Sequence, residues 1–164
     1  MNIKLAGAIA LAAFGMAAAA HAATVTNTMP VKITIQNACN VSTTAPTTLD
    51  FGTQGPLVAN VDSTSTITVT CTNLAPYNVG LDAGLNGAGN IGARKMINGV
   101  ATVGYQLYSN SARSTVWGIT VGTDTLAGTG NGTAQSLTVY GRVPPQTTPA
   151  AGVYTDTVGV TVTY

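Results

Sequence analysis

The sequence closes on a strict alternation that restricts the fold more than any other feature. In VGVTVTY, Val158, Val160, Val162 and Tyr164 fall on one face, and glycine and threonine fall on the other. A period of two residues is typical of a β-strand with one buried face and one wet face. Similar short runs recur between turn residues from residue 31 onward, and little of that range has a helical period. The sequence therefore predicts an all-β fold.

The alternating runs place the expected strands along the chain. A hairpin is expected within residues 95–109, because Asn98-Gly99 is a strong signal for a type I′ turn. The Gly- and Ser-rich residues 109–134 are expected to be mostly loop, and the Pro-rich residues 143–152 to be a connector. Seven or so short strands indicate an immunoglobulin-like sandwich. The other runs are 31–36, 48–52, 65–72, 77–84, 136–143 and 152–164.

Residues 1–22 have the pattern of a cleaved signal peptide. Lys4 precedes an apolar run from Leu5 to Ala20, and the small residues of AHA fit a cleavage site before Ala23. The alternative is a retained membrane anchor, but the run is shorter than the roughly 20 residues that span a bilayer. The pattern predicts export of a mature chain that begins at Ala23.

The charged residues after Ala22 exclude most catalytic chemistry. Five basic residues and five aspartates remain, with no histidine and no glutamate, so the formal net charge is zero. Acid–base catalysis and His-based metal sites have few groups to use, and no basic patch is available for nucleic acid. We therefore expect no enzyme, no cofactor and no metal. A chain without net charge repels its own copies weakly, which permits self-association.

Two cysteines remain in the mature chain, Cys39 and Cys71. An even number of cysteines in an exported chain predicts a disulfide, and with two cysteines there is one possible pairing. Two free thiols are the alternative.

The C-terminal run raises the question of what pairs with it. If it is the last strand of the sandwich, a groove beside it stays open, and such an edge promotes aggregation unless an extended segment fills it. The mature N-terminus offers a candidate, because its apolar residues occupy odd positions, with Asn27 as the exception. Pairing between copies would be β-strand addition. The alternative is that these residues form the first strand of a closed sandwich.

Single residues add little to this interpretation. Trp117 lies among polar loop residues and could bind a sugar, but a lone tryptophan in a β-protein more often packs in the core or under a loop. Asp156 has no visible catalytic partner, so a role in a turn or at a strand start is expected.

Several motifs, spread over nearly all of the mature chain, resemble the spore coat protein U domain family. This family includes the major subunits of archaic chaperone–usher pili. The resemblance implies an incomplete immunoglobulin-like β-sandwich that lacks its final strand and is completed by donor-strand complementation. A periplasmic chaperone would lend the strand first, and at an outer-membrane usher the N-terminus of another subunit would replace it. The motifs are NACNV, LDFG, TVTC, VGYQLYSNSARSTVWG and GVYTDTVGVTVTY.

Carried over to this chain, the resemblance implies a donor-strand extension at residues 23–34 and a pilin-like domain at residues 35–164. The donor side chains would be Val25, Met29, Val31 and Ile33, and Pro30 would be tolerated on an edge-like strand. Cys39 and Cys71 would form the disulfide of the family. The acceptor groove and chaperone contact would involve Tyr154, Val158, Val160, Val162 and the terminal Tyr164.

The expected function is that of a structural subunit of a secreted pilus that passes through the periplasm to the cell surface and serves adhesion and biofilm formation. Two alternatives are a minor or tip subunit that binds a surface or glycan, and a coat protein of spores or cysts.

Overall fold

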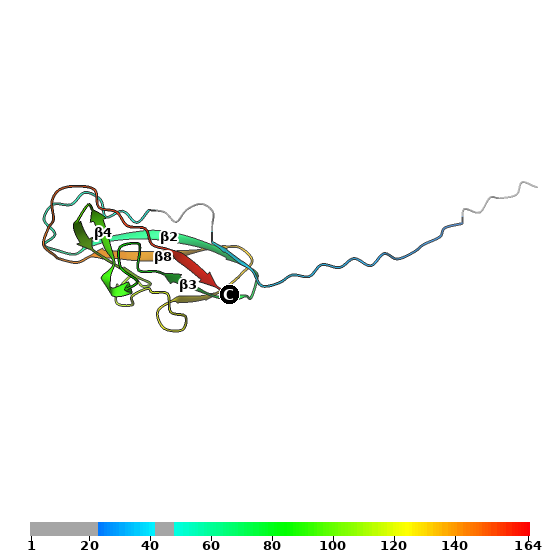
Figure 1. Ribbon diagram of the computed structural model, residues 1–164. Helices are drawn as coiled ribbons and strands as arrows, with labels where there is room; N and C mark the ends of the chain where they lie inside the picture. Colours follow the sequence, from blue (N-terminus) through cyan, green and yellow to red (C-terminus); the bar gives the residue numbers. More distant parts are fainter. Residues whose placement is uncertain (1–22, 42–47) are drawn as a thin grey trace, which may run out of the picture. The chain divides into compact units, whose positions relative to one another are not determined.

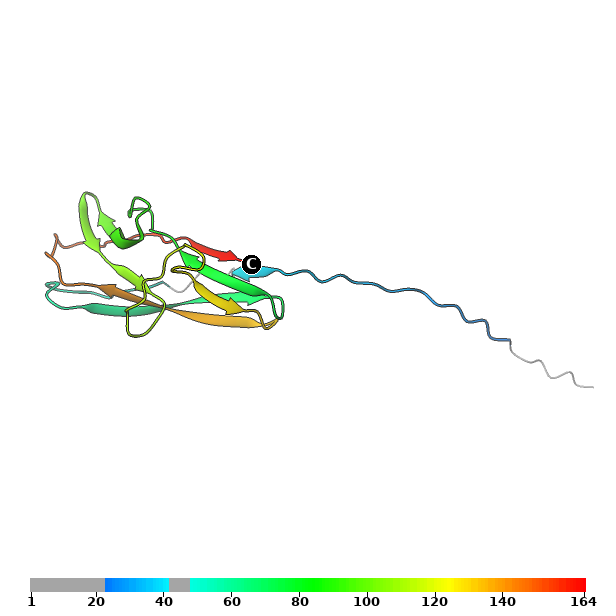
Figure 2. The ribbon, with the colours of Figure 1, turned by 90° about the horizontal axis from the view of Figure 1, so that it is seen from below.

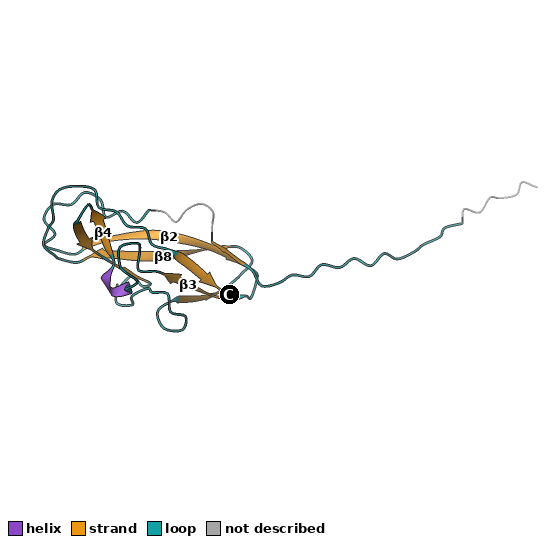
Figure 3. Ribbon diagram, viewed as in Figure 1, coloured by secondary structure: helices purple, strands orange, loops and turns teal. Residues whose placement is uncertain are grey.

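The computed structural model describes residues 23–41 and 48–164, so the expected signal peptide lies outside the described residues. The described residues fall into two units, which divide between Thr34 and Ile35. In the first unit, residues 23–34 contain no strand and are exposed throughout. The second unit contains all the described strands, and the one helical element among its described residues is the 3₁₀ turn η1 (Ile91–Ala93), drawn purple in Figure 3. No helix in the described part of the chain is long and apolar enough to cross a membrane.

The second unit is built from three antiparallel sheets, and Figures 1 and 2 show β2 beside β8 and β3 beside β9. Sheet A has the order β1-β2-β8-β6, sheet B has the order β7-β3-β9, and sheet C is the hairpin β4-β5. The strands are β1 (Cys39–Val41), β2 (Val61–Cys71), β3 (Pro76–Leu81), β4 (Lys95–Asn98), β5 (Ala101–Gly104), β6 (Gln106–Tyr108), β7 (Leu126–Thr129), β8 (Ala134–Val143) and β9 (Val160–Thr163).

One apolar core joins these sheets into a sandwich, which confirms the expected all-β class. Alternate side chains of β2 and β8 meet alternate side chains of β3, as the period of two predicts. Trp117 is fully buried in this core, and its Nε1 donates a hydrogen bond of 2.7 Å to the carbonyl of Val79. The expectation of a packing role for Trp117 is therefore confirmed.

The expected disulfide joins Cys39 to Cys71, which lie directly opposite each other in the β1–β2 ladder. It ties the first two strands of sheet A together at one end of the sandwich. We call this the disulfide end. Thr163 also lies there, because it pairs with Asn78 near the start of β3, just after the turn that follows Cys71.

The hairpin prediction is confirmed, with Gly99 at a φ of +59° in the turn between β4 and β5. Four other predictions differ from the structure. In the run 152–164, only Val160–Thr163 form a strand, β9. The run 31–36 forms no strand, because no described strand lies beside it to supply hydrogen bonds. The run 48–52 forms no strand. In the expected loop region, β7 pairs with β3 at the edge of sheet B.

Candidate functional site

The C-terminal segment forms an edge of the sandwich. Within the described residues, β9 pairs with β3 alone and ends sheet B. The carbonyls of Thr155, Thr157 and Gly159 accept hydrogen bonds of 2.9–3.1 Å from Ile97, Leu85 and Asp82, on the side of sheet B and the hairpin. Because successive residues of an extended strand point their backbone groups to opposite sides, the even-numbered residues direct theirs to the open side.

A groove of about 980 Å³ runs along this open edge. One wall is the C-terminal segment, residues 148–158 with Val160, and the other is formed by residues 48–55 and Leu57. The floor is mostly apolar and comes from the core faces of both sheets and of the hairpin. It includes Ile67, Leu81, Met96, Val103, Leu107 and Val139.

The wall at residues 48–57 depends on a glycine of β8. A Cβ on Gly141 would lie 2.7 Å from the side chain of Leu49 and 3.0 Å from that of Phe51, closer than packed carbons approach each other. Glycine at this position therefore lets the wall lie directly on sheet A. Several backbone groups of the wall form hydrogen bonds within the domain, as where Ser63 Oγ donates to Asp50 O and Gln146 N donates to Leu57 O.

The structure brings three of the five expected acceptor residues into the groove. Tyr154, Val158 and Val160 line it and are half-buried. Val162 packs against the same core beyond the lining, and Tyr164 lies outside the groove with its side chain 60% exposed. The expected donor residues Val25, Met29, Val31 and Ile33 are all 82–93% exposed.

Sequence reasoning missed a polar cluster at the groove. Asp156 accepts hydrogen bonds from Tyr105 Oη at 2.7 Å and from Asn86 Nδ2 at 2.8 Å. The cluster ties the C-terminal wall to the loop after β3 and to the segment before β6. Burial, followed by the contact with the Asp156 carboxylate, raises the pKa of Tyr105 well above its ordinary value. Asp156 therefore has a structural role, and the cluster adds polar atoms to an otherwise apolar groove.

The raised pKa of Tyr105 predicts a loss of stability at high pH. The unfolded phenol ionises near pH 10, whereas the folded phenol keeps its proton, so the stabilisation is complete below about pH 10 and declines as the pH rises toward the folded pKa. We expect the unfolding free energy to fall by up to about 1.4 kcal/mol per pH unit through this group. In Tyr105→Phe the decline above pH 10 should be shallower, and the two profiles should run parallel below pH 9. Equal slopes above pH 10 in denaturant titrations would contradict this expectation.

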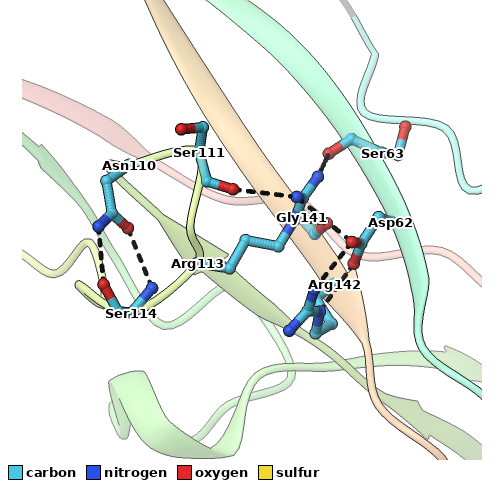
Figure 4. A network of polar contacts seen from close by, with 8 residues as sticks. All are labelled: Asp62, Ser63, Asn110, Ser111, Arg113, Ser114, Gly141 and Arg142. Carbon is cyan, nitrogen blue, oxygen red and sulfur yellow. Dashed lines mark hydrogen bonds and ion pairs between the residues drawn. The ribbon is translucent and has the colours of Figure 1, made fainter.

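A second polar network lies on the outer face of sheet A, where Arg113 and Arg142 both contact the carboxylate of Asp62 (Figure 4). Arg142 donates to Asp62 from Nε at 2.7 Å and from Nη2 at 2.8 Å, and Arg113 Nη1 lies 3.3 Å from the same carboxylate. These contacts, chiefly the hydrogen bond from Arg142, lower the pKa of Asp62. Arg113 also donates to Gly141 O and Ser63 O, so it fastens its own loop across β2 and β8. The residues of both ranges that the structure describes contain no cluster of three or more metal-binding side chains.

Comparison with known proteins gives three findings. The model of the Spore Coat Protein U domain family matches residues 25–161. Protein U of Myxococcus xanthus is 37% identical over 177 residues, which cover 99% of this chain and 98% of that protein. A solved structure is also similar, the chaperone–tip adhesion subunit pre-assembly complex CsuC–CsuE from archaic chaperone-usher Csu pili of Acinetobacter baumannii. It matches with a TM-score of 0.56 and 26% identity over 80% of this chain and 40% of the matched chain.

Proposed function

Because the chain belongs to the Spore Coat Protein U domain family, we propose that it is a structural subunit of a surface pilus in which the N-terminal segment of one copy fills the groove of the next. One observation carries the proposal: an apolar groove runs beside an edge strand with free backbone positions, and the same chain has an exposed segment with alternating apolar residues. Strand addition satisfies both features, because the ladder pairs with the edge and the alternate side chains enter the groove.

The energetics favour insertion of the segment. Each large apolar side chain that moves from water into the groove contributes about 1.5–3 kcal/mol. Four such side chains, Val25, Met29, Val31 and Ile33, contribute roughly 6–12 kcal/mol before the entropy cost of ordering the segment. That gain supports a polymer that resists dissociation.

The proposal includes the route of assembly. Residues 1–22 direct export and are removed, a periplasmic chaperone covers the groove, and an outer-membrane usher exchanges the chaperone for the next subunit. The similarity to a structure of a chaperone–tip adhesion subunit pre-assembly complex supports the chaperone step of this route. Tyr164 is proposed to contact the chaperone. The proposed activity is assembly, with no catalytic step.

Deletion of residues 23–31 tests the proposal. In the organism that encodes the chain, the deleted protein should be exported but should no longer form multimers that survive sodium dodecyl sulfate without boiling. Val31→Asp should have the same effect, since it places a charge on the inserted face. Thr28→Asp, on the opposite face of the segment, is the matched control and should keep the multimer ladder. A wild-type ladder from the deleted chain would refute the proposal.

A coat protein is the second candidate, and the family description together with the full-length match to Protein U favours it. It would use the same groove and segment but form a layer on a spore or cyst. Immunogold labelling of intact cells decides between the two, because a pilus gives labelled filaments on growing cells and a coat labels the resting form.

A further inference from the structure

We infer that Pro30 selects the partner of the donor segment: it favours antiparallel insertion into a second copy over parallel insertion into the chain's own groove. This inference rests on the proposed function and concerns the one residue of the segment that lacks a backbone N–H.

Connectivity sets the direction of self-insertion. Residue 34 must stay beside Ile35, and the chain just after Ile35 is held at the disulfide end, where Thr72 Oγ1 donates to Gln36 O and accepts from Ala38 N. β9 runs toward this same end, because it passes from the Leu81 side of β3 to the Asn78 side. A chain that folds back into its own groove therefore ends its donor segment where β9 ends, and the two strands are parallel.

The open side of β9 decides which donor residues form hydrogen bonds with it. The even-numbered residues from 154 to 162 turn their side chains inward and their backbone groups toward the groove. In the donor the inward residues are odd-numbered, so Pro30 faces outward.

In an antiparallel pair, two residues directly opposite each other exchange both hydrogen bonds. The inward, odd-numbered donor residues then form the ladder with β9, and Pro30 points its nitrogen toward the wall at residues 48–57. That wall is not part of a sheet, and the carbonyls of Asp50, Phe51 and Leu57 already accept hydrogen bonds. The missing N–H costs little in this orientation.

In a parallel pair, each residue bonds the two neighbours of the residue opposite it. The outward, even-numbered donor residues then form the ladder, and one of them is Pro30. A carbonyl of the β9 edge loses its donor inside the groove, and the ring of Pro30 crowds it. An unsatisfied buried carbonyl disfavours the parallel form by about tenfold.

Moving the proline between even-numbered and odd-numbered positions of the segment tests the inference. Pro30→Ala removes the bias. Asn27→Pro with Pro30→Ala reverses the bias, because odd-numbered residues such as 27 form the ladder in the antiparallel pair. The change removes no apolar side chain, since residue 27 is an asparagine. Thr28→Pro with Pro30→Ala keeps the proline at an even position and is the matched control. All three changes lie in the exposed unit and leave the sandwich unaltered.

The readout is trypsin cleavage after Lys32, the one basic residue between Ala23 and Val41, after refolding of the exported chain at a series of concentrations. Self-insertion protects Lys32 in the monomer at every concentration, whereas insertion between copies protects it only in multimers. We expect the ratio of protected monomer to multimer to rise about tenfold over wild type in Pro30→Ala, where the bias is removed, and about a hundredfold in the variant with proline at position 27, where it is reversed. The control should match wild type.

If the wild-type chain forms multimers through its segment but the proline-27 variant and the control give the same protected monomer fraction, the inference is wrong and the proposed function stands. If the chain deleted for residues 23–31 forms wild-type multimers, the proposed function is wrong, and the inference that rests on it is withdrawn.

Discussion

Replacement of Arg94 by methionine is expected to lower the unfolding free energy by about 3–5 kcal/mol. The Arg94 side chain is almost fully buried, and burial lowers its pKa from the ordinary value. Its guanidinium donates to the carbonyls of Leu81, Asp82 and Trp117 at 2.7–2.8 Å and to Gln106 Oε1 at 2.6 Å. Methionine fills similar space but removes the donor from the three backbone carbonyls in an environment of low polarity, whereas Gln106 Oε1 still accepts from Leu107 N.

The neighbouring Lys95 supplies the control for this experiment. Lys95 is exposed, so Lys95→Met removes the same charge from the chain and is expected to change stability by less than about 0.5 kcal/mol. Urea titrations of both variants measure the difference. Equal midpoints would mean that water satisfies the carbonyls around position 94, and that Arg94 does not hold the end of β3 against the segment before β6.

Replacement of both cysteines by alanine is expected to lower stability by about 3–4 kcal/mol. The disulfide closes a loop with a sequence separation of 32, and its removal lets the unfolded chain gain the corresponding entropy. Cys71 is also buried, so the variant loses part of its packing as well. The expected loss is a large fraction of the stability of a domain of this size.

Reduction gives an independent check on the disulfide. Dithiothreitol should shift the urea midpoint of the wild-type chain to that of the Cys39→Ala/Cys71→Ala variant, and should leave the variant unchanged. A wild-type midpoint that does not move in the reductant, with the thiols shown by alkylation to be free, would contradict the expected contribution.

Alternation located the strands that form the centre of each sheet, because a half-buried strand needs a period of two. It therefore placed β2 and β8 in sheet A and β3 in sheet B. It also identified the inward face of the C-terminal segment at the edge of sheet B, whose half-buried positions are the even-numbered ones from 154 to 162. It failed for residues 31–36, where the same pattern occurs without a neighbouring strand. A pattern shows which face would be buried, and it does not show whether a partner is present.

Only one of the two walls of the groove could be predicted from the sequence. The C-terminal wall follows from alternation, but the wall at residues 48–57 depends on Gly141, which is distant in the sequence and permits the close approach of Leu49. Asp156 likewise acquires its role from Tyr105 and Asn86 in distant segments. The role of Arg94 could not be predicted from the sequence. Its partners are mostly backbone carbonyls, and every type of residue has one.

The position of the disulfide has a mechanical consequence for a subunit under tension. A pull on residues 23–34 reaches the domain only a few residues before Cys39, and the covalent bond passes that force directly to Cys71 at the end of β2. The load thus bypasses the three-residue β1 and spreads over the ten registered pairs that join β2 to β8. Force along the strands shears all of these hydrogen bonds together, whereas without the bond β1 would peel from the sheet one pair at a time.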